Sequence, residues 1–241
     1  LGALLRNKGD IATAEQLYRE ALAMRRTLLG DDHLSVGESL NNLGLLLRDK
    51  GDYAGAEALW RESLALHRRI LGNEHHEVAK ALKSLAIVLL DKGDLDAAES
   101  SIMDALAMQR KLLGDDHAEA AFSQTVLAQV LLARGETGAA ESTLREAITS
   151  LRKALPATHW MIPYTESLLG GCLTVLGRYD EAEPLLLNAE AALRRVRGNR
   201  DRIALDALQR IVHLYDSWGK PEKAADFSGL LPASDAPGPI K

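Results

Sequence analysis

Two acidic residues and a histidine recur within six residues at two places in the sequence. The segment LLGDDH stands at Leu28–His33 and again at Leu112–His117, and a near copy, ILGNEH, lies between them at Ile70–His75. Carboxylate and imidazole groups at this spacing could form part of a zinc site, or an acid and base pair for catalysis. The same residues could instead separate two helices. Their relation to the elements around them decides between these interpretations.

The composition indicates a soluble helical protein. Hydrophobic residues make up 46 % of the 241 residues and aromatic residues only 4 %, and the strong helix formers Leu and Ala dominate. The net charge of −5 argues against a general nucleic-acid binder, and the sequence has no apolar run long enough for a membrane span. A single cysteine, Cys172, excludes an internal disulfide. We therefore expect a cytoplasmic protein without a nucleic-acid or membrane partner.

Writing the chain in lines of 42 residues aligns its columns without a gap. One column holds only glycine: Gly9, Gly51, Gly93, Gly135, Gly177 and Gly219. In the second line, apolar residues recur at three- and four-residue spacing before Gly51 and again from Ala56 onwards, which predicts two helices. Gly51 can take the left-handed conformation that ends a helix, and Asp52 can cap the next one. One such pair cannot bury its apolar face alone, so the pairs must stack into an all-α solenoid.

These columns resemble the tetratricopeptide repeat. Leu40-x-x-Leu43-Gly44-x-x-Leu47, followed by Ala56-x-x-x-Trp60, is similar to that family's W-x2-L-G-x2-Y and A-x3-F pattern. The usual period is about 34 residues. The extra residues here fall around LLGDDH, as in the longer repeats of kinesin light chain and many bacterial proteins. The resemblance implies a right-handed α-solenoid of antiparallel helix pairs. HEAT and armadillo repeats share the longer period but lack the glycine column and the Ala-x-x-x-aromatic step.

The domain organisation follows from the repeats. We predict a single solenoid over residues 1–231, with about five and a half repeats and a truncated first helix, because the first line begins midway through that helix. Residues 232–241 are Pro-rich without an apolar period and are predicted to be a disordered tail. The last two lines are also similar to repeats that follow serine/threonine kinase domains in some bacterial proteins. A regulatory region of a larger signalling protein is therefore the alternative function.

The alignment argues against a metal or catalytic site in LLGDDH. His33, His75, His117 and His159 share one column, and neighbouring repeats stack about 10 Å apart. The ligands of one zinc ion lie about 2 Å from it, so one histidine per repeat does not make a zinc site. We expect the acids of this segment, and Asp201 in the fifth line, to meet the free N–H groups of the next helix. No phosphate-binding loop or nucleophile motif occurs. We therefore predict no enzyme, cofactor or metal ion.

Basic pairs form another column, near the end of each second helix: Arg25-Arg26, Arg68-Arg69, Arg110-Lys111, Arg152-Lys153 and Arg194-Arg195. Cations suit the negative end of the helix dipole, and acidic residues follow them closely in the sequence. A solvated face is therefore favoured over a nucleic-acid surface.

The resemblance further implies that the first helix of each repeat lines a concave groove for a protein or peptide partner. The groove columns hold Glu38, Asn41, Asn42, Leu45, Arg48, Lys80, Lys83, Ile87, Phe122, Thr125, Gln129, Tyr164 and Ser167. One end is polar and basic, and the other offers Phe122 and Tyr164 with room beside Gly171. An acidic or carboxylate-bearing peptide with an apolar anchor would fit, which predicts a protein-interaction scaffold. A chaperone-type carboxylate clamp matches only in part, and the alternative is that these residues pack or face water.

Overall fold

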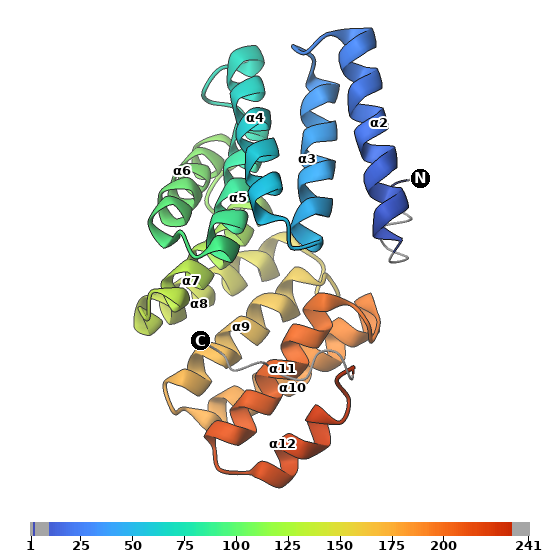
Figure 1. Ribbon diagram of the computed structural model, residues 1–241. Helices are drawn as coiled ribbons and strands as arrows, with labels where there is room; N and C mark the ends of the chain where they lie inside the picture. The colour runs from blue at the N-terminus through green and yellow to red at the C-terminus, as the bar shows by residue number, and fades with distance from the viewer. Residues whose placement is uncertain (1, 3–9, 233–241) are drawn as a thin grey trace. The chain divides into compact units, whose positions relative to one another are not determined.

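The computed structural model describes residue 2 and residues 10–232, and the regular elements in that part of the chain are all helices (Figure 1). They are α2 (Ile11–Leu29), α3 (Leu34–Asp49), α4 (Tyr53–Leu71), α5 (His76–Lys92), α6 (Leu95–Leu113), α7 (Ala118–Ala133), α8 (Thr137–Ala154), α9 (Met161–Val175), α10 (Tyr179–Arg197), α11 (Arg202–Ser217) and α12 (Pro221–Ser228). The all-α class is therefore confirmed. The predicted truncated first helix and, apart from Pro232, the predicted tail lie outside the described residues.

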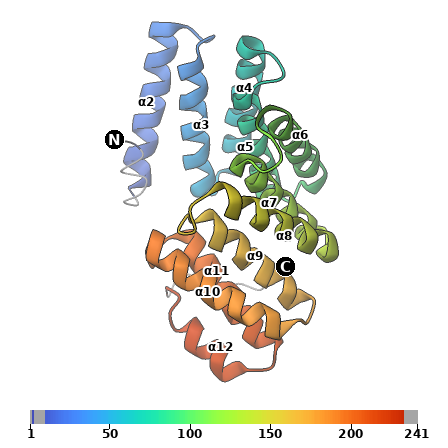
Figure 2. The same cartoon turned by 180° about the vertical axis from the view of Figure 1, so that it is seen from behind.

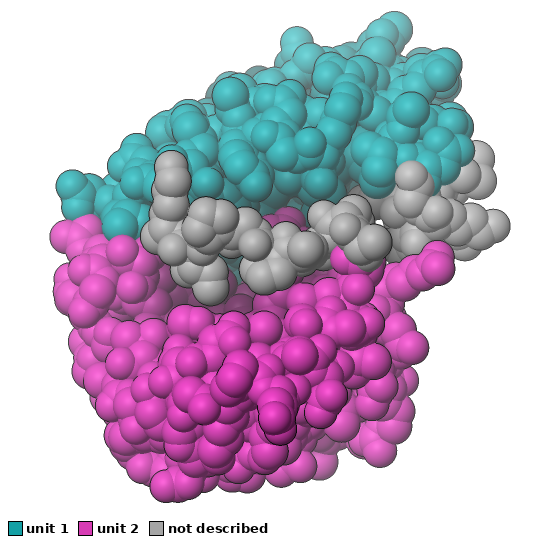
Figure 3. Space-filling view, turned by 60° about the horizontal axis from the view of Figure 1, so that its bottom comes forward, with its two compact units in different colours: residues 1–114 teal, residues 115–241 magenta. Residues whose placement is uncertain are grey.

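The chain divides into two compact units, Leu1–Gly114 and Asp115–Lys241 (Figure 3). In unit 1, α3 packs against α4 and α5 against α6, and α2 packs on α3. In unit 2, the packed pairs are α7 with α8, α9 with α10 and α11 with α12 (Figure 2). Each unit is thus built from the helix pairs that the period of 42 indicates. One continuous domain over residues 1–231 stays a prediction.

The turn within each pair follows the expected chemistry. Gly51 has a φ of 85°, a left-handed value that a residue with a Cβ rarely adopts. The carboxylate of Asp52 accepts a hydrogen bond from the backbone N–H of Gly55 at 2.9 Å and caps α4. The Lys50-Gly51-Asp52 segment therefore ends one helix and starts the next, as predicted.

Small residues let the two helices of a pair approach closely. Trp60 is 1 % exposed and lies against Gly44, where an added Cβ would come within 2.9 Å of the indole ring. Ala56 and Ser63 are also buried on this face of α4. In the next three repeats the position of Trp60 is filled by the buried residues Ile102, Leu144 and Leu186. The core of each pair therefore lies along these columns.

The segments between pairs differ in one respect from the prediction. Gly30, Gly72, Gly114 and Gly198 end the second helices as expected. The caps of the next helices, however, are the histidines: the Nδ1 atoms of His33, His75 and His117 accept backbone N–H groups at 3.1–3.2 Å. The expectation that the preceding acids would cap was wrong. In the fifth repeat Asp201 does cap, at 3.0 Å from the N–H of Ile203.

The acids of LLGDDH instead join one repeat to the next. Asp32 pairs with Arg69, Glu74 with Lys111, and Asp116 with Lys153. Each acid thus meets a basic residue at the end of the following second helix, because the period of 42 places the same two columns side by side in these three cases; in the next repeat Thr158 stands in the acid column. The positive charges of Arg69, Lys111 and Lys153 are consequently balanced by neighbouring carboxylates. This agrees with the interpretation of the basic column as a solvated face.

The histidine caps lead to a direct test. His75→Ala should lower the free energy of unfolding by about 1 kcal/mol, because α5 loses the acceptor for the N–H of Glu77. His75→Asp should leave stability close to that of the parent, since aspartate fills this position at Asp201. Urea unfolding followed by circular dichroism measures both. Equal losses in the two variants would show that the imidazole does not act as a cap.

Candidate functional site

A polar pocket lies in unit 1 between α3, α4 and α5. It has a volume of about 170 Å³. The α3 and α5 residues around it include four of those predicted to face a partner: Glu38, Asn41, Asn42 and Lys80. Its other lining residues are Gly37, Ser63, His67, Glu77 and Ala81. The structure thus brings the asparagines and one of the basic residues of the predicted groove into one site.

The packing of α4 on α3 orients one of the two asparagines. The indole Nε1 of Trp60 donates a hydrogen bond to Oδ1 of Asn41 at 3.0 Å. This bond occupies the carbonyl oxygen of Asn41, so its NH₂ group remains as a donor. The Asn42 side chain next to it is exposed. Two adjacent amides on α3, one held by the core and one in solvent, are suited to bond the backbone of an extended peptide.

The charged residues of the pocket are partly neutralised. Lys80 lies 3.1 Å from the Glu77 carboxylate, one turn earlier on α5. Glu38 is 66 % exposed at the side chain and lies 3.5 Å from Arg25 of α2. Arg25 makes shorter bonds elsewhere, to the backbone oxygen of Ser35 at 2.7 Å and the hydroxyl of Ser39 at 2.9 Å. Of the charged side chains that line the pocket, Glu38 consequently has the longest ion-pair distance and the weakest ion pair.

A buried histidine belongs to this pocket. His67 of α4 is 5 % exposed, and its Nδ1 has no hydrogen-bond partner among the described residues. Burial lowers the pKa of its imidazole below the usual value, so the ring is neutral at neutral pH. Its other nitrogen faces Gly37, where an added Cβ would lie 2.5 Å from Nε2. The glycine on α3 therefore makes room for the ring on α4.

The remaining predicted residues of unit 1 lie outside the pocket lining. Arg48 forms an ion pair with Asp91, which joins α3 to α5 and engages the guanidinium within the protein. Leu45, Lys83 and Ile87 are half-buried. These residues support the surface around the pocket, and Arg48 has a structural role that the sequence did not reveal.

In unit 2 the predicted groove positions are engaged by their neighbours. Thr125 and Ser167 are both 0 % exposed, so the prediction that they face a partner was wrong. The hydroxyls of Thr125 and Thr165 are 3.1 Å apart, and Arg210 of α11 donates to Ser167 at 3.1 Å. The room expected beside Gly171 is taken by the Arg210 side chain, whose Cδ would lie 3.2 Å from an added Cβ.

The aromatic end of the predicted groove is a packed cluster. The ring centroids of Phe122 and Tyr164 are 6.4 Å apart, and Trp160 lies 6.0 Å from each of them. The Tyr164 hydroxyl donates to Gln129 at 3.2 Å, and the Arg197 guanidinium covers the Trp160 ring at 4.9 Å. The aromatic side chains are half-buried and pack against one another, so these positions are less available to a partner than the sequence pattern indicated.

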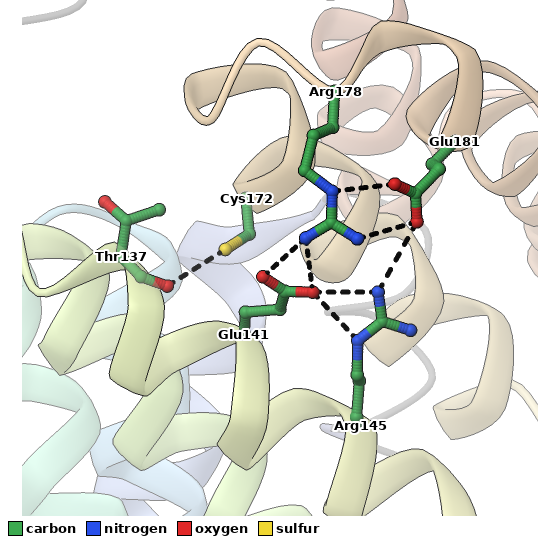
Figure 4. Close-up of polar contacts among 6 residues, drawn as sticks. All are labelled: Thr137, Glu141, Arg145, Cys172, Arg178 and Glu181. Carbon is green, nitrogen blue, oxygen red and sulfur yellow. Dashed lines mark hydrogen bonds and ion pairs between the residues drawn. The ribbon is translucent and has the colours of Figure 1, made fainter.

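A cluster of charged side chains in unit 2 lies beside Cys172 (Figure 4). Arg178 contacts Glu141 of α8 and Glu181 of α10, and Arg145 completes the network. The guanidinium groups hold the pKa of the Glu141 carboxyl below its usual range. Burial raises the pKa of the Cys172 thiol to about 11, and the thiol donates to the backbone oxygen of Thr137 at 3.3 Å. The thiol therefore stays protonated at neutral pH, and the cluster joins repeats rather than activating a nucleophile.

The described residues contain neither a cluster of metal-ligand side chains nor a helix suited to cross a membrane. In that part of the chain, His, Cys, Asp and Glu do not gather in a group of three or more that could hold a metal ion. None of the described helices combines the length and the apolar character that a membrane crossing requires.

The sequence reasoning missed the floor of the pocket. His67 and Ser63 lie on α4, whereas only first helices were considered as partner-facing. A signal was present in the column of His67, which reads Arg25, His67, Gln109, Leu151 and Leu193. This column is polar in the first three repeats and apolar in the last two, and it is buried from His67 onwards, which marks unit 1 as chemically different.

Comparison with known proteins gives a family match. A tetratricopeptide repeat model matches residues 1–59, 36–111 and 85–153. No curated protein sequence matches the chain.

Several solved structures share the fold. The kinesin light chain TPR-like repeats of Podosopora anserina are 22 % identical, with 81 % of this chain and 93 % of that chain covered and a TM-score of 0.64. BtubC from P. vanneervenii is 18 % identical, with 98 % and 94 % covered and a TM-score of 0.67. The Rap conjugation gene regulator of plasmid pLS20, solved with the Phr* peptide, is 16 % identical, with 98 % and 62 % covered and a TM-score of 0.76.

Proposed function

Because the chain belongs to the tetratricopeptide repeat family, we propose that it is a non-catalytic interaction scaffold whose unit 1 binds a peptide segment of a partner protein. The observation that carries the proposal is the polar pocket. It brings Asn41, Asn42 and Lys80 from two successive first helices to one surface. A Rap regulator with a similar fold is solved with the Phr* peptide, and another Rap protein with the Competence and Sporulation Factor; the first supports a peptide as the class of ligand.

The asparagines favour recognition of the peptide backbone. An asparagine amide offers both donors and an acceptor, so it can bond the C=O and N–H groups of an extended chain. The acidic partner predicted from Lys80 and Lys83 has less support, because Lys80 lies against Glu77. A regulatory region following a kinase domain stays the alternative for the longer protein.

Asn42→Ala tests the proposal on an exposed side chain. An array of blocked peptides of varied sequence should bind the parent chain, and the variant should bind the same peptides about five- to tenfold more weakly, as expected for the loss of one or two hydrogen bonds. Asn73→Ala is the matched control, because Asn73 is exposed in the segment between α4 and α5, away from the pocket. Asn41 is less suitable, since it also holds Trp60. Unchanged binding by Asn42→Ala would show that the peptide site lies elsewhere.

A further inference from the structure

The charges around the pocket point to a particular kind of peptide side chain. Two carboxylates, Glu38 and Glu77, and one ammonium group, Lys80, line it. Lys80 and Glu77 are 3.1 Å apart and compensate each other, which leaves the exposed carboxylate of Glu38. Arg25 lies 3.5 Å from Glu38 and makes its shorter hydrogen bonds to neutral groups of Ser35 and Ser39, so the exposed Glu38 carboxylate keeps acceptor capacity for a second cationic group.

The floor of the pocket offers hydrogen-bond capacity without positive charge. The Ser63 hydroxyl donates to the backbone oxygen of Gly37 at 3.4 Å, so its lone pairs remain as acceptors. The neutral imidazole of His67 has a ring nitrogen, Nδ1, with no partner among the described residues. A buried polar atom without a partner is uncommon in folded proteins, so the imidazole that lines the pocket retains hydrogen-bonding capacity that the described residues do not use.

The volume suits a planar head group. A cavity of about 150 Å³ holds a benzene molecule, so the volume of about 170 Å³ accommodates a guanidinium group. Arginine presents five N–H donors in a planar fork and bonds carboxylates in pairs. An aspartate or glutamate side chain would instead bring a second negative charge beside Glu38.

We propose that the pocket takes a basic side chain of the bound peptide, an arginine in the first place, with its guanidinium on Glu38 and its N–H donors towards Ser63 and His67. This inference rests on the proposed function and names the residue that the peptide supplies. It also assigns a role to the polar residues of α4, which contact the side chain while Asn41 and Asn42 of α3 hold the backbone.

The test uses blocked hexapeptide mixtures with one fixed position, occupied by Arg, Lys, Leu or Glu, and all other positions randomised. Binding to the full chain is measured by fluorescence polarisation. The arginine mixture should bind most tightly, with lysine second. Glu38→Gln should weaken arginine binding about fivefold, the size expected for one exposed ion pair. The control Glu62→Gln, on α4 outside the pocket lining, should leave it unchanged.

The outcomes separate this inference from the proposed function. Preference for the glutamate or leucine mixture, with binding lost in Asn42→Ala but kept in Glu38→Gln, would overturn the basic side chain and leave the peptide site standing. Equal loss in Glu38→Gln and Glu62→Gln would also overturn it, because the effect would then come from net charge. Binding of no mixture at all would overturn both proposals.

Discussion

Replacing Trp60 by alanine should lower the free energy of unfolding by about 3–5 kcal/mol, the cost of emptying a fully buried aromatic position. Trp60 is 1 % exposed, fills the space opened by Gly44 and donates its indole N–H to Asn41. Peptide binding should fall with stability, because the Asn41 amide loses the bond that fixes it at the pocket. Urea unfolding and the peptide array measure the two effects.

Trp60→Leu separates packing from orientation. Leucine is the residue at this position in later repeats, Leu144 and Leu186, so it should retain part of the packing and cost less than alanine. The leucine side chain cannot donate a hydrogen bond to Asn41. The peptide affinity of Trp60→Leu should therefore fall by more than its smaller loss of unfolding free energy would explain. If the leucine variant bound peptides as well as the parent, the Trp60–Asn41 bond would not position the site.

The helix pairs could be predicted because they depend on local chemistry repeated at a fixed period. The glycine column marks the turns, as at Gly51, and the aspartate after it caps the next helix. The small column at Ala56 is buried and permits close helix packing. Each of these features involves residues that are near one another in sequence, and five or six copies of each reinforce the pattern.

The partners of charged residues could not be predicted in the same way. Asp32 was expected to face a helix start, but it pairs with Arg69, one repeat later, while His33 provides the cap. Both arrangements satisfy the polar groups of the segment. The choice depends on how far one repeat is displaced from the next, which the sequence pattern does not specify.

The residues of the candidate site could be placed in part for a related reason. Asn41, Asn42 and Lys80 of the first-helix columns line one pocket of unit 1, and their contact with a partner stays a prediction. The same columns failed at Thr125 and Ser167, which are buried. The Thr125 hydroxyl bonds Thr165 of the following first helix, α9, and Ser167 of α9 accepts a hydrogen bond from Arg210 of α11. A column gives the direction of a side chain, but the length and chemistry of its neighbour decide whether it stays accessible.

The second large effect is expected at Gly37. Gly37→Ala should lower the free energy of unfolding by about 1–3 kcal/mol, because the new Cβ would lie 2.5 Å from His67 Nε2 in a packed region. The greater helix propensity of alanine, worth about 1 kcal/mol, offsets part of this cost. Gly138→Ala is the matched control: it lies in α8 with nothing within 4 Å of an added Cβ, so it should be neutral or stabilising.

The next repeat supplies the compensating change. There the equivalent pair is Ala79 and Gln109, both buried, so Gly37→Ala combined with His67→Gln should recover most of the lost stability. The interaction energy in this double-mutant cycle should be at least about 1 kcal/mol, as for residues in direct contact. Additive single effects would mean that Gly37 does not serve to admit the imidazole.

The pH dependence of the same variants provides an independent check of the buried imidazole. Burial lowers the pKa of His67 in the folded protein, so the unfolded chain takes up a proton first as the pH falls. The stability that the neutral ring permits is complete above the unfolded pKa of about 6.5 and is lost as the pH falls below it towards the folded pKa. His67→Gln should therefore lose less stability than the parent on moving from neutral to mildly acidic pH, as measured by urea unfolding at the two pH values. If His67→Gln and the parent lost the same unfolding free energy as the pH falls, the imidazole would take up its proton as readily in the folded chain as in the unfolded one. The neutral imidazole that the proposed arginine recognition requires would then have no support.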